Sequence, residues 1–324
     1  MRQRADRKKR SKTGACAAAV STDSVECKEV AFHHAGYDPK SSNPVMFRLR
    51  GSKNYKGGVY AGTAMLILHT ILDKEISQKV SYTLERGGRL FDLGYDSILN
   101  ENDYYIHCPN PENPEDLLYQ FPVVPGLSVW EYPRSAPLYW SLHGEKSVVK
   151  TRSTIDVVKH PTGLEWPKLC NKAVIGRDKH CVLSGAPASR CERAYLIPKR
   201  ERYFYKSEMM STYMGERSKR NNTIDIHHPM NGITLRLDLL QAYDVGDFVF
   251  VPVGEHWIAH FFDPTSPLGR EYDQRPIKLS QEIPRPYLLV RVAIAAFALA
   301  KDFLEQKAHA PSSDRSDELE VSEG

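Results

Sequence analysis

Side chains suited to acid–base or metal chemistry gather in one short segment of the sequence. His227 and His228 stand directly before a proline, and Asp225, Asp238 and Asp244 lie nearby. Imidazoles and carboxylates accept protons and bind divalent cations, so the segment holds candidates for a general base and for metal ligands. The simpler interpretation is a His-His loop feature with aspartates at a helix terminus or on the surface. The sequence has no H-E-x-x-H motif and no nucleophile elbow.

The preceding segment, residues 199–222, combines positive charge with aromatic rings. Basic side chains that meet phosphates, beside rings that stack on bases, are what binding of DNA or RNA requires. Two alternatives remain open: the rings cover the core, or the charge serves only solubility. The basic residues are Lys199, Arg200, Arg202, Lys206, Arg217, Lys219 and Arg220, and the rings are Tyr203, Phe204, Tyr205 and Tyr213.

Two strands are predicted upstream of the histidine pair. CERAYLIPKR, residues 191–200, has an apolar run that ends at Pro198 and leads into the basic segment. CVLSG, residues 181–185, predicts a strand that ends in a glycine turn and pairs with the strand around Tyr195. The residue in the middle of this strand is a tyrosine, so no side chain that ordinarily titrates near neutral pH stands there.

The elements after the histidine pair are also predicted from local pattern. Asn231 with its following glycine indicates a tight turn, and residues 235–243 predict a short helix that stops at Gly246. FVFVPV and WIAHFF predict two strands of a hairpin. The expected order is strand, long loop, turn, helix and strand.

This order resembles the fungal branch of the HNH endonuclease family over roughly residues 165 to 300. The stretches that carry the resemblance are CVLSGAP, CERAYLIPKRERYFY, an Asn-Gly pair, LRLDLLQAYD and FVFVPV. The resemblance implies a ββα-metal unit: a strand histidine acts as the base for water, an asparagine fixes the loop, and a helix histidine binds one divalent metal. Phosphodiester hydrolysis needs both the activated water and the cation.

The family's asparagine corresponds to Asn231, but neither histidine position holds a histidine. Tyr195 stands at the general-base position, and Leu240, nine residues after Asn231, stands at the metal-ligand position. The resemblance therefore implies a degenerate HNH protein, a pseudoenzyme that binds nucleic acid or a protein partner with little or no cleavage.

The alternative is an active endonuclease with compensating residues. His228 is then the candidate substitute for the base, and His227 and Asp244 are candidate metal ligands. An active enzyme would need a divalent metal such as Mg, and an inactive one would need no cofactor.

For the whole chain we predict an α+β fold. A β-rich N-terminal region precedes the HNH-like ββα-metal domain, and a helix from about 285 to 303 packs on that domain. VMFRLR and DYYIH predict strands, and GGVYAGTAMLILHTIL is expected to begin as one. The expected divisions are a disordered basic arm at 1–30, the β-rich region at 31–164, the HNH-like domain at 165–305 and an acidic disordered tail at 306–324.

Net charge, cysteine content and apolar stretches bear on the partners and the location of the protein. The net charge of +4 is small for 324 residues and does not by itself indicate a partner. The six cysteines include no C-x-x-C pair, so buried thiols are favoured over zinc, and no apolar signal sequence precedes them. We expect an intracellular protein, nuclear or cytoplasmic. The apolar stretch Leu288 to Ala300 is too short for a membrane span, and the sequence leaves the oligomeric state open.

Overall fold

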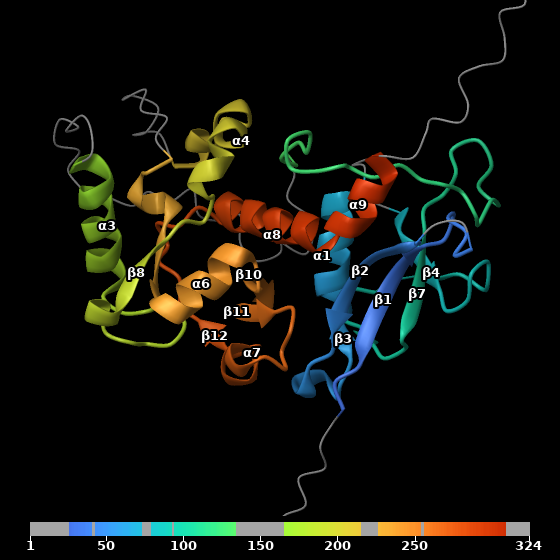
Figure 1. The fold of residues 1–324 in the computed structure, drawn as a ribbon, viewed down its shortest axis with the longest axis horizontal. Helices are drawn as coiled ribbons and strands as arrows, with labels where there is room; N and C mark the ends of the chain where they lie inside the picture. Colours follow the sequence, from blue (N-terminus) through green and yellow to red (C-terminus); the bar gives the residue numbers. More distant parts are fainter. Residues whose placement is uncertain are drawn as a thin grey trace, which may run out of the picture.

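The computed structural model of the chain describes residues 26–40, 43–72, 79–92, 94–133, 165–214, 226–253 and 256–308. Most of the predicted basic arm and of the acidic tail lies outside these residues. The α+β fold is confirmed: a β-rich N-terminal part and a mixed C-terminal part lie toward opposite ends of helix α8 (Arg285–Leu299), as Figure 1 shows.

The N-terminal part is built on a five-stranded sheet with the order β2-β1-β7-β4-β5. β1 pairs antiparallel with β2 and parallel with β7, so the strands predicted from VMFRLR and DYYIH are confirmed. Phe32 stacks on Phe47 of the neighbouring strand, with 4.6 Å between ring centroids; such cross-strand pairs stabilise a sheet. The strands are β1 (Glu29–His34), β2 (Val45–Arg50), β4 (Ser81–Thr83), β5 (Phe91–Asp92) and β7 (Asp103–His107).

The apolar run GGVYAGTAMLILHTIL is mostly a helix. Only β3 (Val59–Tyr60) is extended, paired with β6 (Ile98–Leu99), and α1 (Ala61–Ile71) follows at once. Every residue of α1 except His69 is buried. A helix that is apolar on all sides shows no period, which is why the pattern gave no helix signal, while its Ala, Met and Leu residues favour a helix.

The C-terminal part contains the strand, strand and helix order expected of the resemblance. β8 pairs antiparallel with β9, and α6 follows β9 without a loop. β10 and β11 form the predicted hairpin, and β12 pairs with β11. The elements are α3 (Glu165–Asp178), β8 (Cys191–Ala194), β9 (Ile233–Arg236), α6 (Leu237–Val245), β10 (Phe248–Val253), β11 (His256–Phe261) and β12 (Pro276–Ile277).

The strand predicted for CVLSG is wrong, because residues 181–185 form a turn. The amide of Cys181 donates to the carbonyl of Ala186 at 2.8 Å, and the amide of Gly185 donates back to Cys181 at 2.9 Å. Gly185 has φ of +74°, the left-handed conformation that glycine adopts readily. The partner of β8 is therefore β9, which is distant in sequence, and Tyr195 comes directly after the last residue of β8.

Short helices connect these strands. The predicted helix at 285 to 303 is divided at Ala300, so a second helix, α9, follows α8. Among the described residues no helix is both long and apolar enough to cross a membrane. The connecting elements are η1 (Lys53–Tyr55), η3 (Ala188–Arg190), η4 (Lys199–Glu201), α4 (Arg202–Ser207), η5 (Met210–Met214), η6 (Pro229–Asn231), α7 (Pro267–Tyr272) and α9 (Lys301–Ala308).

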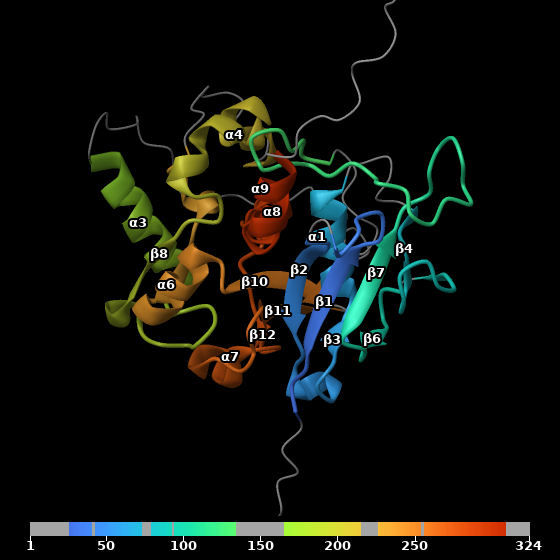
Figure 2. The ribbon, with the colours of Figure 1, turned by 45° about the vertical axis from the view of Figure 1, so that its right-hand side comes forward.

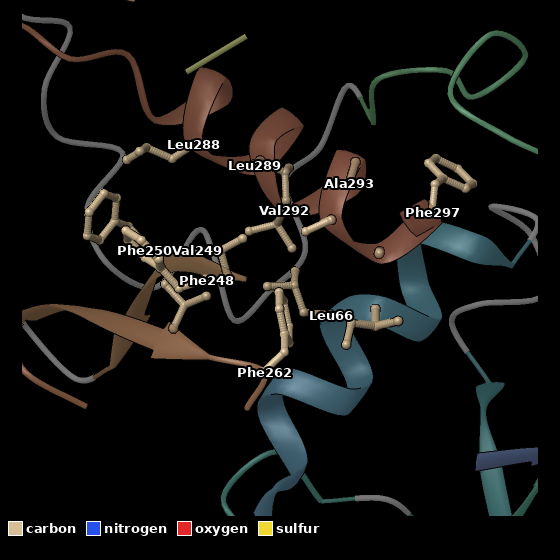
Figure 3. Close-up of a cluster of buried hydrophobic side chains, with 14 of the residues drawn as sticks. Leu66, Phe248, Val249, Phe250, Phe262, Leu288, Leu289, Val292, Ala293 and Phe297 are labelled. Carbon is tan, nitrogen blue, oxygen red and sulfur yellow. The ribbon is translucent and has the colours of Figure 1, made fainter. Parts of the chain in front are cut away.

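Helix α8 joins the two parts through one continuous apolar core. Figure 3 shows Val292 and Leu289 of α8 between Phe248 of β10 and Leu66 of α1. In the second view of the ribbon, α8 lies next to both the hairpin and α1 (Figure 2). The HNH-like unit is therefore held on the same core as the N-terminal sheet.

One charged residue lies inside this core. The side chain of Arg291, on α8, is 1% exposed, and none of its three nitrogens has a hydrogen-bond partner among the described residues. Its Cζ lies 4.1 Å from the ring centroid of Tyr243 on α6. Burial lowers the pKa of the guanidinium, as expected when a cation loses its water. The contact with the ring offsets only part of that cost.

We therefore expect Arg291→Met to raise the free energy of unfolding by about 1 to 4 kcal/mol, because methionine keeps the packed stem and removes the buried charge. Arg291→Ala should lower it instead, since a cavity remains. Thermal and urea unfolding would measure both. Lys301→Met, at a side chain that is 66% exposed, controls for loss of a positive charge. A destabilised Arg291→Met variant would contradict this assignment.

Candidate functional site

The side chain of Asn231 fixes the loop that carries the histidine pair. Its Oδ1 accepts from the amide of Ile197 at 2.8 Å, and its Nδ2 donates to the carbonyls of Ile197 and Ile226, both at 2.9 Å. Asn231 is fully buried. The side-chain amide of Asn231 therefore joins Ile226, just before the histidine pair, to Ile197 in the chain that leaves β8. Three hydrogen-bonding positions of this amide are satisfied.

Arg193 of β8 also fixes this loop, through hydrogen bonds to the backbone carbonyls of the loop. Its Nη1 donates to the carbonyl of His227 at 2.9 Å, and its Nη2 donates to the carbonyls of His228 and Asn231 at 2.9 and 3.1 Å. Gly232 is required beside it, because a Cβ at this position would overlap the Arg193 side chain. Sequence analysis missed Arg193. Its one local signal is that it shares an inward face of the strand with Cys191.

Tyr195, at the predicted general-base position, forms a hydrogen bond with a histidine. Its hydroxyl lies 2.8 Å from Nδ1 of His227. Two cations approach its ring: Cζ of Arg193 at 4.1 Å and Nζ of Lys199 at 4.9 Å from the centroid. Tyr195 and His227 are both half-buried. The position thus presents a phenol and an imidazole joined at the protein surface and bordered by positive charge.

The side chain of His228 forms a hydrogen bond with the backbone. Its Nδ1 accepts from the amide of Met230 at 3.2 Å, which caps the short helix η6. Such a contact satisfies a backbone donor that the first turn of a helix leaves open. The structure thus brings His227, and not His228, into hydrogen-bond contact with Tyr195.

The predicted ligand position on α6 is apolar and has no nearby substitute on the helix. Leu240 is half-buried and packs against the hydrophobic core. Asp238 forms a two-point ion pair with Arg236, at 2.7 Å for each contact, and this pairing holds the pKa of Asp238 below its usual range. Asp244 is exposed. Asp225 lies outside the described residues.

The described side chains around Tyr195 and Leu240 do not form a set of ligands for a divalent metal. No group of three His, Cys, Asp or Glu side chains comes together within the described part of the chain. Nδ1 of His227 is engaged in a hydrogen bond with the hydroxyl of Tyr195, and the side chain of Leu240 has no atom that could bind a metal. The cysteines do not supply the set either: Cys191 contacts the carbonyls of Ala186 and Pro187 through its sulfur.

The basic segment begins next to Tyr195 and forms a short helical ridge. Lys199 and Arg200 belong to η4, and Arg202 and Lys206 belong to α4, which follows immediately. All four side chains are exposed. Arg200 pairs with its neighbour Glu201 at 3.2 Å, and no ion pair of the other three occurs among the described residues. Of the remaining predicted contacts, Arg217, Lys219 and Arg220 lie outside the described residues.

Comparison with known proteins agrees with this geometry. Residues 181–251 of the 324 match the family described as HNH endonuclease. The matched range includes β8, the basic helices, the Asn231 loop, β9, α6 and most of β10. No curated protein matches the chain, and no solved structure does. Residues 181–251 are therefore similar to an HNH nuclease-type domain, and nuclease-type chemistry or nucleic-acid binding is the class of function that this similarity supports.

Proposed function

We propose that the protein binds nucleic acid through its HNH domain and cleaves it little or not at all. The proposal rests on the resemblance, which places Tyr195 and Leu240 where the family has histidines, and on the loop scaffold that the structure shows around Asn231. Asn231 keeps its three side-chain hydrogen bonds, while the two reactive positions hold Tyr195 and Leu240. The contacts that fix the loop are therefore present although neither position holds a histidine.

Magnitudes favour an inert site. A positioned general base contributes about 10²- to 10⁴-fold to a rate, and a phenol, whose pKa is ordinarily about 10, is a poor base at neutral pH. A missing metal ligand removes a further contribution, the neutralisation of charge on the leaving oxygen. Leu240 cannot restore it, because its side chain has no atom that donates to a metal.

Binding can persist without cleavage, because different residues support it. Lys199, Arg200, Arg202 and Lys206 are exposed in one helical ridge that starts 4.9 Å from the Tyr195 ring. Phosphate contacts from such side chains supply most of the sequence-independent affinity for nucleic acid. The position where the family performs catalysis therefore lies beside a surface suited to phosphates.

The second candidate is an active endonuclease, and the contact of His227 with Tyr195 is the observation in its favour. In that case the imidazole of His227 would replace the missing base one side chain away, with His228 or Asp244 assisting. The engagement of His228 with Met230 and the exposure of Asp244 count against it.

We expect the purified protein to give no cleavage of DNA or RNA with Mg²⁺ or Mn²⁺, and the double variant Tyr195→His, Leu240→His to gain metal-dependent cleavage. Gel analysis of labelled duplex and single-stranded substrates would measure both. Asn231→Ala in the double-variant background is the control, because it should remove the gained activity. Cleavage by the unmodified protein that His227→Ala abolishes would establish the second candidate instead.

Binding should weaken steeply as salt concentration rises, because each neutralised phosphate releases counterions. The plot of log K against log salt falls by about 0.7 to 0.9 for each phosphate contacted, so Arg202→Gln with Lys206→Gln should reduce the slope by about 1.5. Fluorescence anisotropy at several salt concentrations measures it. Lys278→Gln with Lys301→Gln, two exposed lysines outside the ridge, removes the same charge. Equal slopes in both double variants would exclude the ridge as the binding surface.

A further inference from the structure

The aromatic residues of the basic segment do not serve one purpose. Phe204 and Tyr205 are 5% and 0% exposed, whereas Tyr203, the residue before them, is 79% exposed. Phe204 stacks on Trp130 with ring centroids 5.8 Å apart, and the Tyr205 hydroxyl lies 2.9 Å from that of Tyr287. Phe204 and Tyr205 therefore belong to the core, and Tyr203 points outward.

The outward position of Tyr203 is set by the helix. Successive side chains of an α-helix point about 100° apart, so burial of Phe204 and Tyr205 turns Tyr203 to the opposite side. Among the described residues, Tyr203 has no ring contact and no hydrogen bond. It is the most exposed large apolar side chain of the described chain. Core packing thus presents a whole aromatic face to solvent.

The surroundings of Tyr203 are basic. Arg200 precedes it by three residues, which is about one turn of the continuous η4 and α4 helices, and its side chain is 64% exposed. Arg202 and Lys206, one helical turn apart, are exposed on the same short helix. A stacking ring between cations is complementary to a strand that carries phosphates and unpaired bases.

We propose that Tyr203 is a stacking platform that makes the basic ridge prefer single-stranded nucleic acid over duplex. This inference rests on the proposed function of the same domain. In a duplex each base already stacks on its neighbours, so its face cannot reach Tyr203. In a single strand a base can leave its neighbours and lie on the ring, while Arg200, Arg202 and Lys206 contact the phosphates on either side.

The ridge also joins this platform to the position of Tyr195. Lys199, whose Nζ lies 4.9 Å from the Tyr195 ring, comes one helical turn before Tyr203. A bound strand therefore passes from Tyr203 along the cations toward the Tyr195 and His227 pair. Stacking selects for a flexible strand, and it sets no sequence code, because every base has an aromatic face.

The test is anisotropy titration of the full chain with labelled oligonucleotides of about 16 nucleotides. Single-stranded DNA, single-stranded RNA and duplex DNA are compared at one salt concentration. We expect the unmodified protein to bind at least one single strand more tightly than the duplex. Tyr203→Leu should weaken single-strand binding by about 5- to 150-fold and leave duplex binding unchanged. Tyr203→Phe, which keeps the ring, should behave like the unmodified protein.

Two further measurements keep the outcomes distinct. Phe91→Leu removes a ring that is 39% exposed on the distant strand β5, and it should change neither affinity. Thermal unfolding checks that Tyr203→Leu is folded. If single strands and duplex bind equally and Tyr203→Leu has no effect, the stacking platform is overturned while nucleic-acid binding stands. If no nucleic acid binds, the proposed function fails as well.

Discussion

The domain depends on how one loop's backbone carbonyls are satisfied. The residues between β8 and β9 return to the core at Ile226, and their carbonyls would be costly to bury without donors. Asn231 supplies donors and an acceptor to Ile197 and Ile226, and Arg193 supplies donors to three further carbonyls. These contacts fix where β8 ends and therefore where Tyr195 meets His227. None of them requires a metal or a reactive group.

Local pattern predicted the elements whose partners are close in sequence. The hairpin of β10 and β11 follows from two largely apolar runs on either side of Gly254, and the stop of α6 follows from Gly246, which has φ of +93°. Pattern failed where tertiary contacts decide. Residues 181–185 form a turn because β8 pairs with the distant β9, and α1 shows no helical period because it is buried on almost every side.

The sequence indicated which residues belong to the candidate site, but it did not predict which of them are in contact. Asn231, Tyr195 and Leu240 could be aligned with the family's motif, but the hydrogen bond of Tyr195 with His227 joins residues 32 positions apart. Arg193 donates hydrogen bonds to carbonyls 34 to 38 positions away, and the local sequence CERAY does not predict these contacts. Composition indicated the basic segment, and its binding of nucleic acid stays a prediction. Its rings divide between core and surface only once the helix is oriented by Tyr287 and Trp130.

Three groups of residues in this part of the chain differ in exposure. Residues that fix the loop are buried, Tyr195 and Leu240 are half-buried, and the basic residues of the ridge are exposed. The hydrogen bonds that hold the loop come from Arg193 and Asn231, so a change at Tyr195 or Leu240 leaves these hydrogen-bonding groups in place. The ridge is anchored separately, through Tyr205 and Phe204, to α8 and Trp130. Its orientation is thus set by the same core that joins both halves of the chain, and it is independent of any catalytic group.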